Sequence, residues 1–276
     1  MEDKIVESIE DYIKEILRIG KESKGSFFYR GQSNKEFELK PSILRKDMDG
    51  KEDKIYLKVL SECSNEFDVN MTHIDILSKM QHYEVPTRLL DVTTNALVAL
   101  YFACDDKDNE KKDGCVYVFN VDEKSIKQFD SDTISILSSL PRFNDNDKKK
   151  LALYAEREDE IGAFNEHDVV KRLLHEIKKE KPAFENIIDP KHLLRNYFLL
   201  PKKDNPRIIR QSGAFVIYGL GDSKLCINNE IIISGKDKDT ILEELKYMGI
   251  SKPSLHPELY KRAEYIKDCI KRNIDF

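Results

Sequence analysis

Apolar side chains recur along this chain with two different spacings, which predict helices mixed with strands. Over residues 3–19, apolar side chains fall on one face of a helix and charged side chains on the other. Thr72 is placed to cap another helix, which ends near His82. The same periodicity predicts further helices at residues 52–69, 95–104, 131–140, 166–181, 191–200, 240–248 and 257–274.

Short apolar stretches bounded by glycine, proline or charged residues predict the strands. Residues 26–29 are aromatic and end at Arg30-Gly31, and residues 114–121 alternate toward an apolar strand. The later strands are predicted at residues 207–210, 214–220 and 231–233, with Gly213 as an interruption. The charged run at residues 144–150 is predicted to be solvated.

A chain of 276 residues is long enough for one large domain or two small ones, and this order of elements favours one. We expect a single mixed α+β domain with a small β core surrounded by helices. Residues 1–24 would pack as a helix on the core, residues 25–220 would form the central domain, and residues 221–276 would complete it. The sequence leaves open whether residues 122–205 are a helical insertion, a lid or ordinary core.

Composition excludes several classes of function. The net charge of −5, from 46 Lys and Arg against 51 Asp and Glu, argues against a broadly basic nucleic-acid binder. The five cysteines are scattered without a CxxC pair, which makes a zinc site or any other metal site unexpected. The chain begins without an apolar signal region and has no run long enough to span a membrane. A reducing cytoplasm is the expected location, and the abundance of Lys, Ile, Asn and Asp is compatible with a bacterial source.

Two dense polar segments, residues 27–33 and 81–95, stand against aromatic and aliphatic runs. A buried arginine is costly unless it meets an anion or a carboxylate. Arg30 and Arg88, with His82 and Asp91 nearby in sequence, therefore predict a polar pocket in an apolar wall, as is usual for a small-molecule site.

Structural interpretations of these residues stay open at this level. Arg30 could form an internal salt bridge to Asp91, and Arg88 and Asp91 are three apart and could pair with each other. Asp91, Thr93 or Thr94 could serve only as a cap for the helix at residues 95–104. His82 could be an ordinary buried histidine, and Gln211 could simply precede a bulge at Gly213.

These residues also carry a family resemblance. Residues 28–32, Phe-Tyr-Arg-Gly-Gln, resemble the motif that names the FRG domain. Residues 81–93 resemble the central motif of that family, with Glu84 where glycine is usual and Val92 where an aromatic residue is usual. Residues 210–215, Arg-Gln-Ser-Gly-Ala-Phe, are similar to its third motif. The resemblance spans residues 25–220, and the function of FRG domains is largely uncharacterised.

The order of these segments also resembles the layout of ADP-ribosyltransferases. In that layout an early arginine or histidine, a Ser/Thr-rich turn and a late glutamate surround NAD. Arg30, the turn at residues 93–95 and Gln211 would fall in those places, with Gln211 instead of the carboxylate and Asp91 as the candidate to compensate.

This resemblance implies NAD as the substrate and either transfer of ADP-ribose to a protein or nucleic acid, or hydrolysis of NAD. Such an activity would suit a toxin or a phage-defence effector. We expect the residues that act in catalysis to be Arg30, His82, Asp91 and Gln211. The residues expected to bind the nucleotide are Arg30, Gln32, His82, Tyr83, Thr87, Arg88, Thr93 and Thr94.

Two competing hypotheses remain from the sequence. The chain could be a non-catalytic module that binds a nucleotide or a protein partner in a defence or regulatory system, which the replacement of the carboxylate by Gln211 favours. The polar clusters could also form a purely structural network without any ligand.

Overall fold

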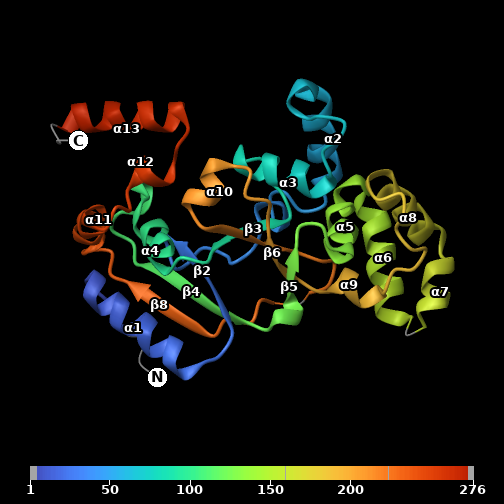
Figure 1. The fold of residues 1–276 in the computed structure, drawn as a ribbon, viewed down its shortest axis with the longest axis horizontal. Helices are drawn as coiled ribbons and strands as arrows, with labels where there is room; N and C mark the ends of the chain where they lie inside the picture. The colour runs from blue at the N-terminus through green and yellow to red at the C-terminus, as the bar shows by residue number, and fades with distance from the viewer. Residues whose placement is uncertain (1–4, 159, 223, 273–276) are drawn as a thin grey trace.

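The computed structural model describes residues 5–158, 160–222 and 224–272, and its centre is one mixed sheet (Figure 1). The eight strands described run in the order β1-β8-β4-β2-β3-β7-β6-β5. The pairs β1–β8 and β5–β6 are parallel, and the other neighbours are antiparallel. The strands are β1 (Ile5–Val6), β2 (Ser26–Gln32), β3 (Leu89–Thr93), β4 (Gly114–Val121), β5 (Ile126–Gln128), β6 (Tyr197–Leu200), β7 (Gly213–Ile217) and β8 (Asn229–Ile233).

The sheet is nearly divided between β2 and β3. β2 pairs with β4 along its whole length, from Ser26 to Gln32, and β3 pairs with β7 from Leu89 to Thr93. Within the described residues, β2 and β3 share a single pair, Tyr29 with Thr93. The two halves of the sheet therefore meet at one point and separate beyond it, where β2 continues to Arg30 and Gln32.

Helices cover the sheet in two groups (Figure 1). One group, α5 to α9, gathers at the end of the sheet near β5 and β6, while α1, α4 and α11 lie at the other end. The helices are α1 (Ile9–Glu22), α2 (Glu52–Glu62), α3 (His73–His82), α4 (Ala96–Cys104), α5 (Asp132–Ser138), α6 (Asp145–Arg157), α7 (Ile161–Glu166), α8 (Asp168–Glu180), α9 (Pro190–Leu194), α10 (Pro206–Arg210), α11 (Lys238–Tyr247), α12 (Lys252–Leu255) and α13 (Leu259–Arg272).

α4 packs directly on β2 and β4, and a glycine in each strand makes these contacts possible. A Cβ atom at Gly31 would lie 1.9 Å from the carbonyl oxygen of Ala99, and one at Gly114 would lie 2.4 Å from that of Ala103. Only a residue without a side chain allows strand and helix to approach so closely. The backbone of β2 is thereby fixed immediately before Gln32.

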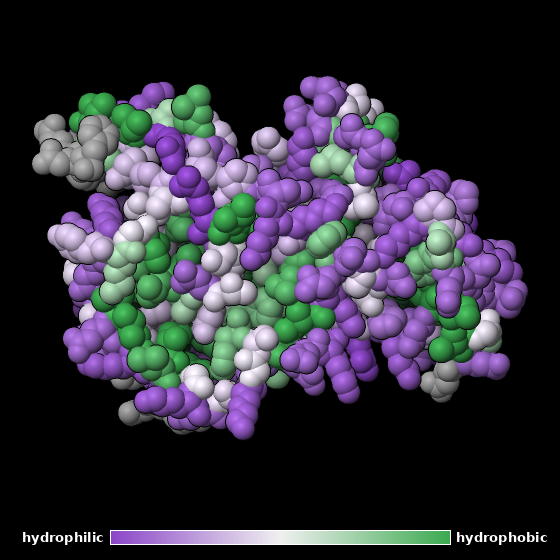
Figure 2. Space-filling model, in the orientation of Figure 1, coloured by the Kyte–Doolittle hydropathy of each residue, from purple (hydrophilic) through white to green (hydrophobic). Residues whose placement is uncertain are grey.

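At the opposite corner of the molecule from α5 to α9, α13 carries exposed apolar side chains, including Leu259 and Ile270. Figure 2 shows apolar atoms at the α13 corner and over the middle of this face, whereas the surface around α5 to α9 is mainly hydrophilic. No helix in the described ranges is long and apolar enough to cross a lipid bilayer.

The prediction of a mixed α/β fold is confirmed, and several local predictions are confirmed with it. Thr72 caps α3 through a capping box with Asp75. The strand predicted at residues 114–121 is β4. The predicted domain boundaries stay predictions.

Other predictions of elements were wrong, for identifiable reasons. Residues 207–210 form helix α10 rather than a strand, because Pro206 occupies its first turn and the Asn205 side chain caps it. Only the first part of residues 191–200 is helical, since residues 197–200 pair with β5 and β7 as strand β6. The helix predicted at residues 52–69 ends at Glu62, and the end predicted at residue 274 lies outside the described residues.

The charged run at residues 144–150 was also wrongly predicted. Most of it belongs to helix α6, in which Asp147 and Lys148 are buried. The helix predicted at residues 95–104 exists as α4, but its cap is Asn95 and not Asp91, Thr93 or Thr94.

Candidate functional site

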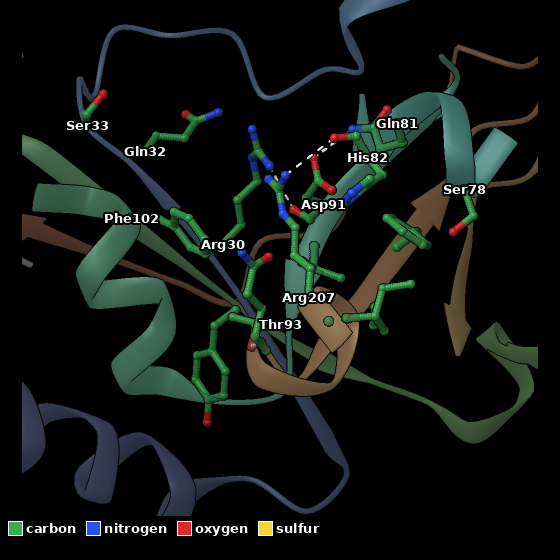
Figure 3. Close-up of a pocket in the computed structure, with 18 of the residues that line it drawn as sticks. Arg30, Gln32, Ser33, Ser78, Gln81, His82, Asp91, Thr93, Phe102 and Arg207 are labelled. Atoms are coloured by element: carbon green, nitrogen blue, oxygen red, sulfur yellow. Dashed lines mark hydrogen bonds between the residues drawn. The ribbon is translucent and has the colours of Figure 1, made fainter. Parts of the chain in front are cut away.

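A cavity of about 370 Å³ opens where β2 and β3 separate. One wall comes from the end of β2, another from β3 and the start of β7, and side chains from α3 and α10 complete it (Figure 3). The lining residues are 29–33, 37, 45, 78, 81, 82, 91–93, 102, 207, 208, 211 and 213–215.

The cavity carries an excess of positive charge. Among the described residues that line it, three are arginines, Arg30, Arg45 and Arg207, while Asp91 is the one carboxylate. Arginine stays protonated throughout the physiological pH range, so this lining favours an anionic ligand.

Arg30 is the most deeply placed of the three. Its Nη1 atom donates a hydrogen bond of 2.7 Å to the backbone carbonyl of Asp91, whereas its buried Nε atom has no hydrogen-bond partner among the described residues. Burial lowers the pKa of Arg30 below its usual value, an effect that Asp91 opposes and Arg45 reinforces. The Arg30–Asp91 ion pair expected by the structural interpretation is not formed between described side chains. A guanidinium with a buried unused donor is suited to an incoming acceptor.

His82 lies on the same side of the cavity as Arg207. Arg207 Nη1 donates to the His82 carbonyl at 3.4 Å, and the Glu258 carboxylate lies 3.5 Å from His82 Nε2 and 3.9 Å from Arg207 Nη1. Burial and the neighbouring Arg207 lower the pKa of His82, and Glu258 only partly opposes them. His82 is therefore neutral at pH 7 and able to accept a proton.

Asp91 is held in position by two further side chains. Gln81 Nε2 donates to Asp91 Oδ2 at 2.6 Å, and Thr87 Oγ1 donates to Gln81 Oε1, also at 2.6 Å. Thr87 is buried and does not line the cavity, so it acts through Gln81. Asp91 itself is exposed at the cavity wall.

Arg88 lies away from the cavity, in a buried ion cluster. Its Nε donates to Glu52 Oε1 at 2.8 Å and its Nη1 to the Tyr218 carbonyl at 2.8 Å, while Lys148 Nζ donates to Glu52 Oε2 at 2.6 Å. Both sequence-based interpretations of Arg88, as a pocket wall and as a partner of Asp91, therefore place it wrongly. Residues 89–93 form a strand, in which side chains three apart point to opposite faces.

The remaining expected residues divide between the cavity and its support. Thr93 lines the cavity, and its hydroxyl donates to the Gln211 carbonyl at 2.7 Å. Gln211 also lines it, with Nε2 donating to the Leu255 carbonyl at 3.2 Å. Thr94 and Tyr83 are exposed and are not lining residues. The cavity thus brings together Arg30, Gln32, His82, Asp91, Thr93 and Gln211, whose roles stay predictions.

Residues 25–112 match the family model of the FRG domain. The chain contains an FRG domain. This match includes the first two motifs, while the third, at residues 210–215, lies outside it. Searches of curated proteins and of solved structures found no significant match.

Several lining residues were missed at the level of sequence. Gln81 stands inside the central FRG motif, and its place there was a usable signal. Arg207 was hidden by the incorrect strand prediction, although Asn205-Pro206 is a helix-start signal. Arg45 and Phe37 belong to irregular segments that give no periodic signal. In the described part of the chain, no group of three or more His, Cys, Asp or Glu is placed to hold a metal ion.

Proposed function

We propose that this FRG-domain protein is an NAD-using enzyme with an ADP-ribosyltransferase-like layout. It would transfer ADP-ribose to a macromolecule, protein or nucleic acid, or hydrolyse NAD. The observation that carries the proposal is the adjacency of β2, β3 and β7 around one cavity. These strands bear or adjoin Arg30, the Thr93 turn and Gln211, the positions that the resemblance assigns to the nucleotide site.

The charge and size of the cavity support a nucleotide ligand. Its volume of about 370 Å³ lies within the range of small-molecule pockets. The diphosphate of NAD is an anion that planar guanidinium groups bind in bidentate fashion, and Arg30 and Arg207 lie together near the centre of the cavity (Figure 3). Arg30 would bind phosphate through its Nε donor, which has no partner in the part of the chain that the structure describes.

The reaction needs one bond broken and one formed. The bond between the nicotinamide ring nitrogen and the ribose C1′ breaks, and nicotinamide leaves with the electron pair. Water or an acceptor nucleophile then bonds to the cationic C1′ and loses a proton, which neutral His82, a lining residue, would accept. Asp91 would stabilise the cationic ribose electrostatically, in place of the late carboxylate.

A non-catalytic binding module is the second candidate, and the hydrogen bonds of Gln211 and Asp91 favour it. Where the ADP-ribosyltransferase layout has a glutamate, this chain has the amide of Gln211. The Nε2 atom of Gln211 already donates to the Leu255 carbonyl. Asp91 would have to supply the missing carboxylate although one of its oxygens accepts a bond from Gln81. Such a module would bind the nucleotide without cleaving it.

Release of nicotinamide from NAD, measured with and without cell lysate, separates these candidates. The variants are Arg30→Met, which removes the charge but keeps much of the volume, and Gln211→Glu, which restores a carboxylate. Arg18→Met is the matched control, because Arg18 lies on α1 and pairs with Glu15 and Glu22 at the surface.

We expect release by the wild type and by Arg18→Met, and at least a tenfold loss in Arg30→Met, since one charge-assisted contact is worth about 1.5–3 kcal/mol. Faster release by Gln211→Glu would support the assigned position of residue 211. Dependence on lysate would indicate transfer. If the folded wild type and Gln211→Glu both bind NAD without releasing nicotinamide, the enzyme proposal is wrong and the binding module replaces it.

A further inference from the structure

Gln32 presents an unusual amide at one end of the cavity. Its side chain is 3% exposed and lines the cavity, yet neither Oε1 nor Nε2 has a hydrogen-bond partner among the described residues. Figure 3 shows it beside Ser33, at the end away from Ser78. Since buried polar groups are nearly always hydrogen-bonded, an amide that lacks both partners calls for an explanation.

The backbone around Gln32 is firmly fixed, which limits rearrangement of its side chain. Gln32 is the last residue of β2 and pairs with Cys115 of β4. Immediately after it, the buried Lys238 ammonium donates to the Ser33 carbonyl at 2.6 Å and to the Asn109 carbonyl at 2.9 Å. The amide is therefore held at the cavity by a rigid strand end.

A second glutamine in the same cavity shows that the fold can satisfy such a group. Gln81 donates from Nε2 to Asp91 and accepts at Oε1 from Thr87. Gln32, which is more deeply buried, has neither kind of bond with any residue that the structure describes. The difference points to a ligand, and not to general polarity of the cavity, as the partner of Gln32.

We infer that Gln32 determines the specificity of this site by pairing with a planar ligand group that carries an adjacent donor and acceptor. This inference rests on the proposed use of NAD and adds which chemical feature of the dinucleotide is recognised. Arg30, two residues earlier on the same strand, would hold the phosphate, and Phe102 offers an apolar wall at the Gln32 end (Figure 3).

Two parts of NAD carry the required pair of groups. The nicotinamide carboxamide has an NH₂ donor beside a carbonyl acceptor, and adenine has its N6 donor beside the N7 acceptor, an edge that glutamine pairs with in other contexts. Replacing the carboxamide by a carboxylate removes the first pair, and replacing adenine by hypoxanthine removes the second. These two analogues identify the part that Gln32 contacts.

Calorimetric titration of the full chain with NAD, nicotinic acid adenine dinucleotide and nicotinamide hypoxanthine dinucleotide tests the inference. Gln32→Met keeps the length of the side chain but removes both polar atoms, and Gln128→Met, on the exposed end of β5, is the matched control. We expect the wild type to bind one analogue at least tenfold more weakly than NAD. Gln32→Met should bind NAD at least tenfold more weakly and lose that discrimination, while the control matches the wild type.

Thermal melting without ligand gives an independent readout. Because the Gln32 amide is buried without partners among the residues described, Gln32→Met should raise the melting temperature by a few degrees, whereas Gln81→Met should lower it. NAD affinity and discrimination retained by Gln32→Met would overturn the inference and leave the proposed function standing. A wild type that binds no dinucleotide would overturn the proposed function and the assigned ligand together. A melting temperature that Gln32→Met does not raise would show that the amide is not held unpaired.

Discussion

The buried cluster of Glu52, Arg88 and Lys148 allows a quantitative test of what holds β3 in place. Glu52 lies in the first turn of α2, Arg88 just before β3, and Lys148 on α6. Their exposed fractions are 6%, 2% and 9%, so all three charges are nearly removed from water. The perturbation is Glu52→Gln, which keeps the shape of the side chain and removes its charge.

The expected loss follows from the charges that remain. Removing one partner of a buried ion pair typically costs about 3–5 kcal/mol, since it leaves an uncompensated charge in the interior. Here Glu52 compensates two cations, Arg88 and Lys148. The glutamine can still accept a hydrogen bond from Arg88, which offsets part of the loss. We expect the free energy of unfolding to fall by about 4 kcal/mol.

Urea denaturation measures this loss, and α2 itself supplies the control. Glu62 lies on the same helix and pairs with Lys58, but the two side chains are 62% and 73% exposed. Exposed pairs of this kind contribute little, so Glu62→Gln should change the free energy of unfolding by less than about 0.5 kcal/mol. A loss below about 1 kcal/mol for Glu52→Gln, or an equal loss in both variants, would refute the assigned role of the cluster.

The pH dependence of the same variants adds a test of sign. Burial raises the pKa of Glu52, but Arg88 and Lys148 lower it further, so its pKa in the folded protein lies below the usual value. The contribution of Glu52 is therefore complete above its unfolded pKa, about 4.3, and is lost as the pH falls through the folded value. The wild type and Glu52→Gln should become similar in stability at low pH. A gap that widens with acid would contradict this account.

Two further predictions concern packing and protonation. Gly31→Ala should destabilise the protein by about 3 kcal/mol or prevent folding, because the added Cβ would lie 1.9 Å from the carbonyl oxygen of Ala99. Gly20→Ala is the control: its added Cβ would have no described atom within 4 Å, so it should be neutral or slightly stabilising. Thermal melting measures both variants. Burial lowers the pKa of His73 to about 4, so the unfolded state gains the proton first and the free energy of unfolding should fall by about 3 kcal/mol between pH 6.5 and 4. In urea titrations at each pH, His73→Leu should reduce the dependence of the free energy of unfolding on pH. An unchanged dependence would contradict the assignment to His73.

Local signals allowed several elements to be predicted from the sequence. The cap at Thr72 depends on residues within one turn, and the apolar alternation of residues 114–121 depends on one strand. Helix α10 was wrongly predicted because Arg207-Ile208-Ile209-Arg210 is short enough to fit either period. The helix-start signal Asn205-Pro206 outweighs the preference of Ile208 and Ile209 for a strand.

The candidate site was predicted less completely, since its geometry depends on contacts between distant residues. The motifs indicated Arg30, His82 and Asp91, and all three line the cavity. Arg88 was placed wrongly because its partner, Glu52, lies 36 residues earlier and carries no local sign of the contact. Neither periodicity nor spacing indicates such a pair.

The two walls of the cavity depend on different interactions, which makes the predictions separable. The Gln32 wall belongs to β2 and is fixed by β4, by the contact of α4 with Gly31 and by Lys238. The Asp91 wall belongs to β3 and is fixed by β7 and, through the residue before β3, by the ion cluster of Glu52. The halves share one strand pair among the described residues, and the phosphate would lie between Arg30 on β2 and Arg207 on α10, just before β7. A folded Glu52→Gln protein should therefore lose more phosphate binding than discrimination between NAD and its analogues. Equal loss of phosphate binding and of discrimination would mean that the two walls move together.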